Sequence, residues 1–228
     1  KLINLCEFLC LNIQFHLLLI QCMSQRILIG GGSGLIGSHL TALLVEEGYD
    51  VRWLSRNPDR YEQETFFWDP SENTMDTAAL NGVDTVIQLA GADIAEKRWT
   101  EKRKRILRES RLDSHLTLLN AIEESDRKPD LYISPSAIGY YGDRGDELLT
   151  EDSEPGKGFL PKLCQEWEEV SNRAVDLGMR LVQFRIGIVL STEGGMLAEL
   201  LPYFKWGIGT VFGSGEEYYS WIHIDDIS

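Results

Sequence analysis

Three glycines with the spacing G-x-x-G-x-x-G constrain this chain more than any other feature of its sequence. Gly31, Gly34 and Gly37 follow an apolar run at 27–29 and open a segment, 35–47, with apolar residues at helical spacing. A strand that enters a helix through such a loop lets backbone N–H groups approach a pyrophosphate, and the helix N-terminus adds a positive dipole end. We therefore expect a dinucleotide-binding site here. Its expected residues are Gly31, Gly32, Ser33, Gly34, Leu35, Ile36 and Gly37.

The rest of the chain alternates strand-like and helix-like segments. This alternation is typical of a parallel sheet with helices on both faces, because strand-to-strand crossovers are right-handed. The sequence predicts an α/β fold, a Rossmann-type doubly wound parallel sheet, over residues 23–190. Residues 191–228 are richer in glycine and aromatic residues and are expected to begin a small substrate-binding subdomain. The expected strands are 26–30, 50–54, 65–68, 84–90, 130–134 and 180–186, and the expected helices are 35–47, 74–80, 100–125 and 159–177.

Composition narrows the classes of partner. The 228 residues carry a formal net charge of -14, which argues against nucleic acid or an anionic membrane surface as a partner. Of the four cysteines, Cys6, Cys10 and Cys22 lie close to the start of the chain, and no C-x-x-C pair occurs. Neither a disulfide framework nor a structural zinc site is therefore expected. A reduced, cytoplasmic setting fits this cysteine usage best.

Residues 1–22 stand apart from the pattern that follows. Their longest uninterrupted apolar run, Leu17–Ile20, is far shorter than the roughly 18–20 residues that a membrane span needs. The small residues of a signal-peptide cleavage site are also absent. We expect an extension that takes no part in the fold, with Met23 as the natural start.

The residues after the second strand distinguish between the two common nicotinamide dinucleotides. An NAD site usually has an acid there for the ribose 2′-hydroxyl, whereas an arginine accommodates the 2′-phosphate of NADP. This chain has Ser55 and Arg56, and both can donate to a phosphate. NADP is therefore the expected cofactor; the alternative is that Arg56 is a solvated loop cation. Leu89, Ala90 and Gly91 end the fourth strand, where small residues leave room for adenosine.

Several motifs taken together resemble a known superfamily. They occur in the order G-G-G-S-G-L-I-G, S-R-N-P, Q-L-A-G-A, K-R-W-T, S-R-L, S-A-I-G-Y-Y-G, K-L-C-Q-E-W-E, R-I-G-I-V-L and S-W-I-H-I-D-D. From about Met23 to Ser228 the chain resembles the extended short-chain dehydrogenases/reductases, and more narrowly their "epimerase family" branch. The resemblance implies an NADP-binding Rossmann domain and a small C-terminal substrate domain, of which part would lie beyond Ser228. It also implies that Arg111 and the backbone of Val189 meet the cofactor.

The catalytic residues of that superfamily are only partly matched. Its members use a serine or threonine and then Tyr-x-x-x-Lys, in which the tyrosine is the general acid/base and the lysine lowers its pKa and holds the nicotinamide ribose. The resemblance places Ser136 at the serine and Lys162 at the lysine, but Gly158 stands where the tyrosine would be. Tyr140 or Tyr141 could supply the proton instead, or could simply pack at the end of a strand.

A histidine and two aspartates lie close together near the end of the chain. His223, Asp225 and Asp226 fall on a segment that reads as a strand, so His223 and Asp225 would share one face and Asp226 would point away. The resemblance implies that this segment is structural, and no metal site is expected.

Two interpretations of function remain open. The first is an NADP(H)-dependent oxidoreductase or epimerase-like enzyme that transfers a hydride to or from a small or sugar-like substrate. The second is a non-catalytic NADP-binding sensor or interaction protein, which the missing tyrosine motivates. A small-molecule substrate and a homodimer are the expected partners.

Overall fold

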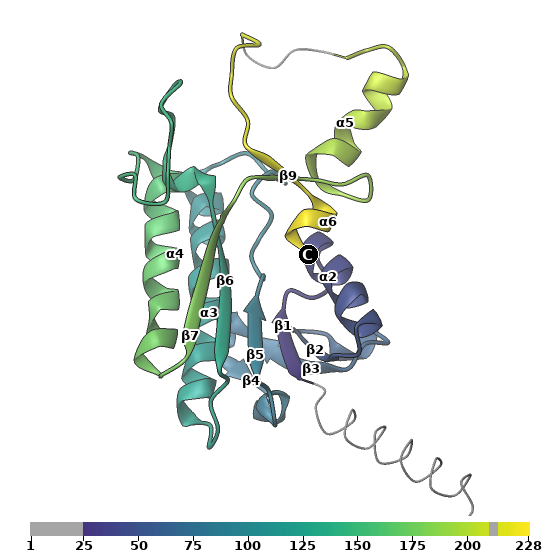
Figure 1. Cartoon of the computed structure of the whole chain (residues 1–228), viewed down its shortest axis with the longest axis vertical. Coiled ribbons are helices and arrows are strands. Elements are labelled where there is room, and N and C mark those ends of the chain that lie inside the picture. Colours follow the sequence, from purple (N-terminus) through teal and green to yellow (C-terminus); the bar gives the residue numbers. More distant parts are fainter. Residues whose placement is uncertain (1–24, 210–213) are drawn as a thin grey trace, which may run out of the picture.

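A seven-stranded sheet forms the centre of the molecule (Figure 1). The computed structural model describes residues 25–209 and 214–228. The strand order is β4-β3-β2-β1-β5-β6-β7, and every neighbouring pair is parallel except β3 and β4. The strands are β1 (Arg26–Gly30), β2 (Asp50–Ser55), β3 (Thr65–Asp69), β4 (Thr74–Met75), β5 (Thr85–Gln88), β6 (Leu131–Ala137) and β7 (Arg180–Ile186).

Three long helices cover the two faces of this sheet. Helices α3 (Glu101–Glu124) and α4 (Phe159–Asp176) pack together on one face, and α2 (Leu35–Glu46) lies on the other (Figure 1). Alternate residues of β1 serve the two faces: Leu28 belongs to the core under α3, and Ile29 belongs to the core under α2. In the described part of the chain, no helix has both the length and the apolar character needed to cross a membrane. A parallel strand buried on both sides is typical of doubly wound sheets, and the predicted Rossmann-type α/β fold is confirmed.

The helix predicted over 74–80 is wrong. The structure instead has the short strand β4 and a 3-10 turn, Thr77–Leu80. Asn73 adopts the left-handed conformation, with φ 49°, and this turn lets β4 run back antiparallel to the end of β3. The segment is too short for apolar spacing alone to separate a helix from a hairpin.

The segment after β7 forms a second, two-stranded sheet. Strand β8 (Ile188–Leu190) pairs in parallel with β9 (Trp221–His223), and α5 (Gly195–Lys205) lies between them in the chain. Strand β9 is shorter than the sequence indicates, because the short helix α6 (Ile224–Ile227) begins directly after it.

The start of α6 changes the geometry expected for the histidine and its two aspartates. His223 and Asp225 do not share a strand face, so that prediction is wrong: His223 Nδ1 accepts a hydrogen bond of 3.3 Å from the Asp225 N–H and caps the helix. The carboxylate of Asp225 also lies 3.0 Å from His39 Nε2, which joins α6 to α2. Among residues 25–209 and 214–228, no group of three or more His, Cys, Asp or Glu side chains could hold a metal ion.

The sheet face that α3 and α4 leave uncovered carries an apolar groove. Its volume is about 320 Å³, and residues of β1, β5, β6, β7 and α2 line it, among them Ile87, Ile133 and Phe184. The groove therefore lies beside α2, on the same side of the sheet.

A buried histidine joins α3, β6 and α4 at the centre of the other face. His115 Nε2 accepts a hydrogen bond of 2.7 Å from the Trp167 indole N–H, and His115 Nδ1 lies 2.8 Å from the hydroxyl of Tyr132. A neutral imidazole has one N–H, so the proton must be on Nδ1, which donates to the Tyr132 oxygen. Burial lowers the pKa of His115 to about 3, and His115 is therefore neutral in the folded protein.

This histidine makes the stability of the fold depend on pH. Below its ordinary pKa of 6.5 the unfolded chain binds a proton that the folded chain cannot accept, so stability falls as the pH decreases from 6.5 toward 3. The expected loss between pH 7.5 and pH 5 is about 2 kcal/mol. Urea unfolding at the two pH values measures it.

The variant His115→Gln is the matched control, because an amide offers both a donor and an acceptor but does not titrate. It should be less stable at both pH values, and its stability should change about 2 kcal/mol less than that of the wild type over the same pH interval. An equal pH dependence in the two proteins would contradict this role of His115.

Candidate functional site

The glycine loop between β1 and α2 has no room for side chains. Gly31 has φ +83°, and a Cβ atom there would lie 2.7 Å from the backbone nitrogen of Ala90. A Cβ atom on Gly37 would lie 2.4 Å from the carbonyl oxygen of Gly31, so the first turn of α2 rests directly on the loop. Gly34 is the N-cap of α2 and supplies no side-chain cap, which leaves the first N–H groups of the helix available to a ligand. The loop therefore fits a pyrophosphate.

The other residues of the loop have separate surroundings. The indole of Trp53 covers Gly32: a Cβ atom at Gly32 would lie 2.3 Å from Trp53 Cδ1. Trp53 is held in turn by a hydrogen bond of 2.9 Å from its Nε1 to Thr41 Oγ1. Ser33 is exposed, whereas Ile36 faces the apolar groove. The structure thus places Ser33, and not Ile36, with its side chain open to a ligand.

Ser55 and Arg56 lie at the end of β2, next to this loop. Leu54 pairs with Gly30 in the parallel register of β1 and β2, so both strands end at the same edge of the sheet. The Ser55 hydroxyl accepts a hydrogen bond of 3.1 Å from the Asn57 N–H, and its own proton remains available. The side chain of Arg56 is exposed.

The end of β5 closes the other side of the loop. The Leu89 N–H donates to the carbonyl of Gly30 at 2.7 Å, and Ala90 contacts Gly31 as described above. Arg111 of α3 lies against Gly91, with 3.3 Å between its Cγ and a Cβ atom placed on that glycine. The structure therefore brings Leu89, Ala90 and Gly91 to the same edge of the sheet as the glycine loop.

Arg111 itself is half-buried and already partnered. Its Nη1 donates to the carbonyls of Ala92 and Leu107, each at 3.1 Å, and its guanidinium lies 5.1 Å from the centre of the Trp167 ring. Burial lowers the pKa of Arg111. These contacts hold the guanidinium beside Gly91, at the edge where the loop lies.

Val189 lies in β8, close to the start of α2. A Cβ atom placed on Gly195 would lie 3.6 Å from the carbonyl oxygen of Val189. The preceding glycine lies against α2, because a Cβ atom placed on Gly194 would lie 3.2 Å from Leu35 Cδ1. The chain after β8 therefore passes over the first residue of α2.

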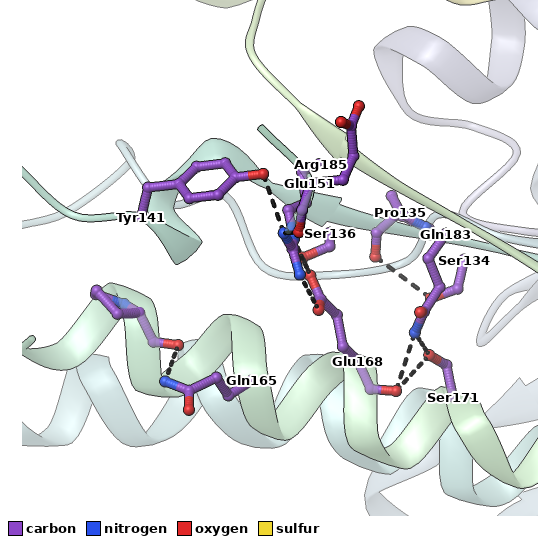
Figure 2. Close-up of polar contacts among 11 residues, drawn as sticks. Ser134, Pro135, Ser136, Tyr141, Glu151, Gln165, Glu168, Ser171, Gln183 and Arg185 are labelled. Atoms are coloured by element: carbon purple, nitrogen blue, oxygen red, sulfur yellow. Dashed lines mark hydrogen bonds and ion pairs between the residues drawn. The ribbon is translucent and has the colours of Figure 1, made fainter. Parts of the chain in front are cut away.

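Ser136, at the end of β6, belongs to a partly buried ionic network (Figure 2). Its hydroxyl donates to Glu168 Oε1 at 2.6 Å. Arg185 of β7 holds the same carboxylate with two hydrogen bonds of 2.9 Å, one from Nε and one from Nη2. The hydrogen bonds to Glu168 raise the pKa of Arg185 further above its usual range, so this cation is permanent.

The two tyrosines meet the other side of Arg185. Its Nη1 donates to the Tyr141 oxygen at 3.0 Å and to the carbonyl of Glu151 at 2.9 Å (Figure 2). The guanidinium carbon also lies 3.5 Å from the centre of the Tyr140 ring. The Glu168–Arg185 ion pair therefore connects Ser136 to both tyrosines. Arg185 makes a cation–π contact with Tyr140 and donates a hydrogen bond to Tyr141.

Lys162 is not brought to this network. Its side chain is 77% exposed, and its nearest acidic partner is Glu166 at 3.9 Å. The face of α4 that contacts the end of β6 has Leu160, Cys164 and Glu168 on successive turns. Lys162 therefore lies outside the group of Ser136, Glu168 and Arg185, and its role toward the nicotinamide ribose stays a prediction.

Sequence reasoning missed Glu168 and Arg185. Both fall inside motifs that carry the family resemblance, K-L-C-Q-E-W-E and R-I-G-I-V-L. The signal that could have found them is a charge within an apolar pattern. Arg185 stands between Phe184 and Ile186 in a strand, and Glu168 follows Trp167 on a helix.

Known proteins share both the sequence and the fold. A family model described as the NAD dependent epimerase/dehydratase family matches residues 27–228. Epimerase family protein Mb2239 of Mycobacterium bovis is 41% identical over 199 residues, which cover 87% of this chain and 65% of that protein. The chain thus spans less than two thirds of the length of this curated relative.

Two solved structures have the same architecture. A nucleoside-diphosphate sugar epimerase from Corynebacterium glutamicum superposes with a TM-score of 0.76 at 38% identity, covering 89% of this chain and 42% of that one. The human epimerase family protein SDR39U1, solved with NADPH, gives a TM-score of 0.78 at 31% identity, covering 89% and 67%. With the glycine loop, the sheet order and the family match in agreement, the chain belongs to the NAD-dependent epimerase/dehydratase family.

Proposed function

We propose that this protein binds NADP(H) and transfers a hydride to or from a small or sugar-like substrate. The observation that carries the choice of NADP is the end of β2, where Ser55 and exposed Arg56 lie beside the glycine loop and no acidic residue takes the position for a ribose 2′-hydroxyl. The human relative solved with NADPH supports the same choice.

The cofactor fits the site as built. The pyrophosphate would lie against Gly31 and Gly37, which have no side chains, and against the uncapped N-terminus of α2. Ser55 and Arg56 would bind the 2′-phosphate. Ala90 would lie beside the adenosine. When bound, NADP(H) supplies or accepts the hydride. Arg111 and Val189 lie on the same edge and are proposed to line the cofactor further along.

The ionic network decides what Ser136 and Tyr141 can do to a substrate. The Ser136 proton is committed to Glu168, so its oxygen can only accept a further hydrogen bond. The Tyr141 oxygen accepts from Arg185, so its own proton remains to be donated. The Ser136 oxygen can therefore accept a hydrogen bond from a substrate hydroxyl, and the Tyr141 hydroxyl can donate one to the carbonyl that the hydroxyl becomes on oxidation. We propose that the proton of the substrate hydroxyl moves through Tyr141. Tyr140 would contribute its ring, which covers Arg185.

Three further parts of the proposal concern the setting of the site. Residues 191–228 are proposed to begin a substrate-binding part, since Tyr203, Phe204 and Trp206 of this segment are exposed. The free, buried thiol of Cys164 and the net charge of -14 support a reduced cytoplasmic setting without a nucleic-acid partner. A homodimer remains part of the proposal.

A second function, a non-catalytic NADP-binding sensor, is favoured by one specific observation. The face of α4 that meets Ser136 offers Leu160 and Cys164 where a proton-transferring pair would be needed, and burial raises the pKa of the Cys164 thiol. In that case the Glu168–Arg185 pair would serve only to hold β7 against α4.

The first test concerns the cofactor. Arg56→Gln should weaken NADPH binding by about 10–100-fold, because it removes charge-assisted hydrogen bonds to a phosphate, and should leave NADH binding nearly unchanged. Fluorescence titration with each nucleotide measures both affinities. Arg180→Gln is the control, because Arg180 is also exposed and lies at the start of β7, at the opposite end of the sheet. A wild-type protein that binds neither nucleotide would refute the proposal.

The second test concerns the loop. Gly37→Ala should abolish measurable NADPH binding and lower the free energy of unfolding by about 1–3 kcal/mol, because the new methyl group meets the Gly31 carbonyl. Gly139→Ala is the matched control, since its Cβ atom would make only ordinary contacts, of 3.4 Å and more. Equal behaviour of the two variants in titration and in urea unfolding would show that the loop is not close-packed.

The third test separates enzyme from sensor. Oxidation of NADPH is followed against a panel of carbonyl compounds and nucleotide sugars, and with any substrate found, Tyr141→Phe should lower kcat by about 10²–10⁴-fold while NADPH affinity stays within about twofold. Tyr49→Phe, at the far end of the sheet, controls for loss of a tyrosine hydroxyl. Tight NADPH binding without turnover on any compound would favour the sensor, and unchanged turnover in Tyr141→Phe would remove this residue from the site.

A further inference from the structure

The start of α3 carries positive charge that the fold does not use. Residues 97–105 include six lysines and arginines and one acidic residue, although the whole chain has a formal net charge of -14. Three of the six cations pair with a nearby glutamate. The other three are exposed and take part in none of the ion pairs of the described residues: Arg98, Lys102 and Arg105. Lys102 lies in the first turn of α3, where a positive charge opposes the helix dipole, so helix stability does not explain this charge.

Two apolar side chains lie among the unpaired cations. Trp99 and Ile106 are 40% and 39% exposed, and Lys102 stands between them at a spacing of three and four residues, which places all three on one side of the helix. The Trp99 ring is fixed, because its indole N–H donates to the carbonyl of Ile94 at 2.8 Å and it packs edge-on against Phe159, with 5.7 Å between the ring centres. The basic face of α3 is the name we give to this surface, which consists of Arg98, Trp99, Lys102, Arg105 and Ile106.

The loop that leads into α4 has the opposite charge pattern. Residues 142–158, which we call the acidic loop, form neither helix nor strand and lie beyond the start of α4 (Figure 1). Leu148 in this loop is 89% exposed, more than any other large apolar side chain of the described residues. Exposed carboxylates that take part in none of the ion pairs of the described residues flank it: Asp146, Glu151, Asp152 and Glu154.

The acidic loop is held in place by two arginines. Arg144 donates two hydrogen bonds of 2.7 Å to the Glu147 carboxylate, and Arg185 donates to the carbonyl of Glu151 at 2.9 Å. Because the acidic loop and the Trp99 ring are both fixed, little conformational entropy would be lost when such surfaces dock.

We propose that the acidic loop of one copy docks on the basic face of α3 of a second copy, with Leu148 against Trp99 and Ile106, and that the reciprocal contact completes a two-fold dimer. This inference assigns a surface to the homodimer of the proposed function and rests on that part of it. A leucine flanked by acids matches apolar side chains flanked by cations, and two-fold symmetry makes each contact occur twice. At physiological ionic strength, charges more than about 8 Å apart are screened, so the net charges of two copies repel weakly while charges in contact still attract.

Single substitutions test the two halves of the interface. Sedimentation velocity of the full chain measures the dissociation constant of the dimer. Arg105→Glu should raise this constant about 10–100-fold, because attractive pairs become repulsive at two symmetric places. Leu148→Ser should raise it about 3–30-fold, because apolar surface is no longer buried. Arg180→Glu, which reverses an exposed cation at the start of β7, is the matched control and should leave it within about twofold.

A mixture of two variants tests whether the contact is reciprocal. A chain with Arg98→Glu, Lys102→Glu and Arg105→Glu has two acidic surfaces, and a chain with Asp146→Lys, Asp152→Lys and Glu154→Lys has two basic ones. Each should be monomeric alone, and an equimolar mixture should form a heterodimer. A mixture that stays monomeric would overturn the reciprocal contact.

The other outcomes distinguish this inference from the proposed cofactor site. NADPH affinity should stay within about twofold in every variant, so a dimer without NADPH binding would refute only the cofactor proposal. A wild type that is monomeric at about 1 mM would overturn the dimer. A dimer that Arg105→Glu and Leu148→Ser leave unchanged would place the interface elsewhere and overturn the assignment. A monomeric wild type that binds poly-glutamate through the basic face would show a different acidic partner, which also overturns it.

Discussion

The close packing of Gly37 of α2 on the carbonyl of Gly31 shapes the edge of the sheet that carries the glycine loop. Helix α2 can come this close to β1 only because neither partner has a side chain at the point of contact. The approach sets the uncapped start of α2 over the end of β1, and it leaves space for Ala90 of β5 on the other side of the loop. The conformation of the glycine loop and its packing against the first turn of α2 depend on this one close approach.

The centre of the sheet could be predicted from the sequence because β1 and β5 are buried along nearly all of their length. Such strands are continuous apolar runs, and each is followed by a helix with its own periodicity, so the order of the elements is visible without tertiary contacts. Two segments near the limits of the fold could not be predicted in this way. The hairpin at 74–75 depends on one left-handed residue, Asn73, and the end of β9 depends on the cap that His223 gives to α6. Both are local backbone events that apolar spacing does not record.

The residues proposed to bind the cofactor could be predicted from the sequence, whereas the ion pair beside Ser136 could not. Glycines, a serine and an arginine at strand ends are local signals, and the structure brings them to one edge. Lys162 was assigned through the family resemblance, and a shift of two residues along a helix turns a side chain by about 200°. That rotation is the difference between the exposed Lys162 and the inner face with Cys164. Glu168 and Arg185 come from separate elements, and only the packing of α4 on β7 makes them a pair.

The indole that covers the glycine loop has a consequence for the sequences this fold accepts. Trp53 occupies the space that a side chain at position 32 would need, and it is fixed there by Thr41 and by Tyr61. Positions 32 and 53 therefore cannot vary independently: a relative with a side chain at the first must have a smaller residue at the second. Covariation between a loop and a neighbouring strand would thus reflect steric volume, with no change in the ligand that the loop binds.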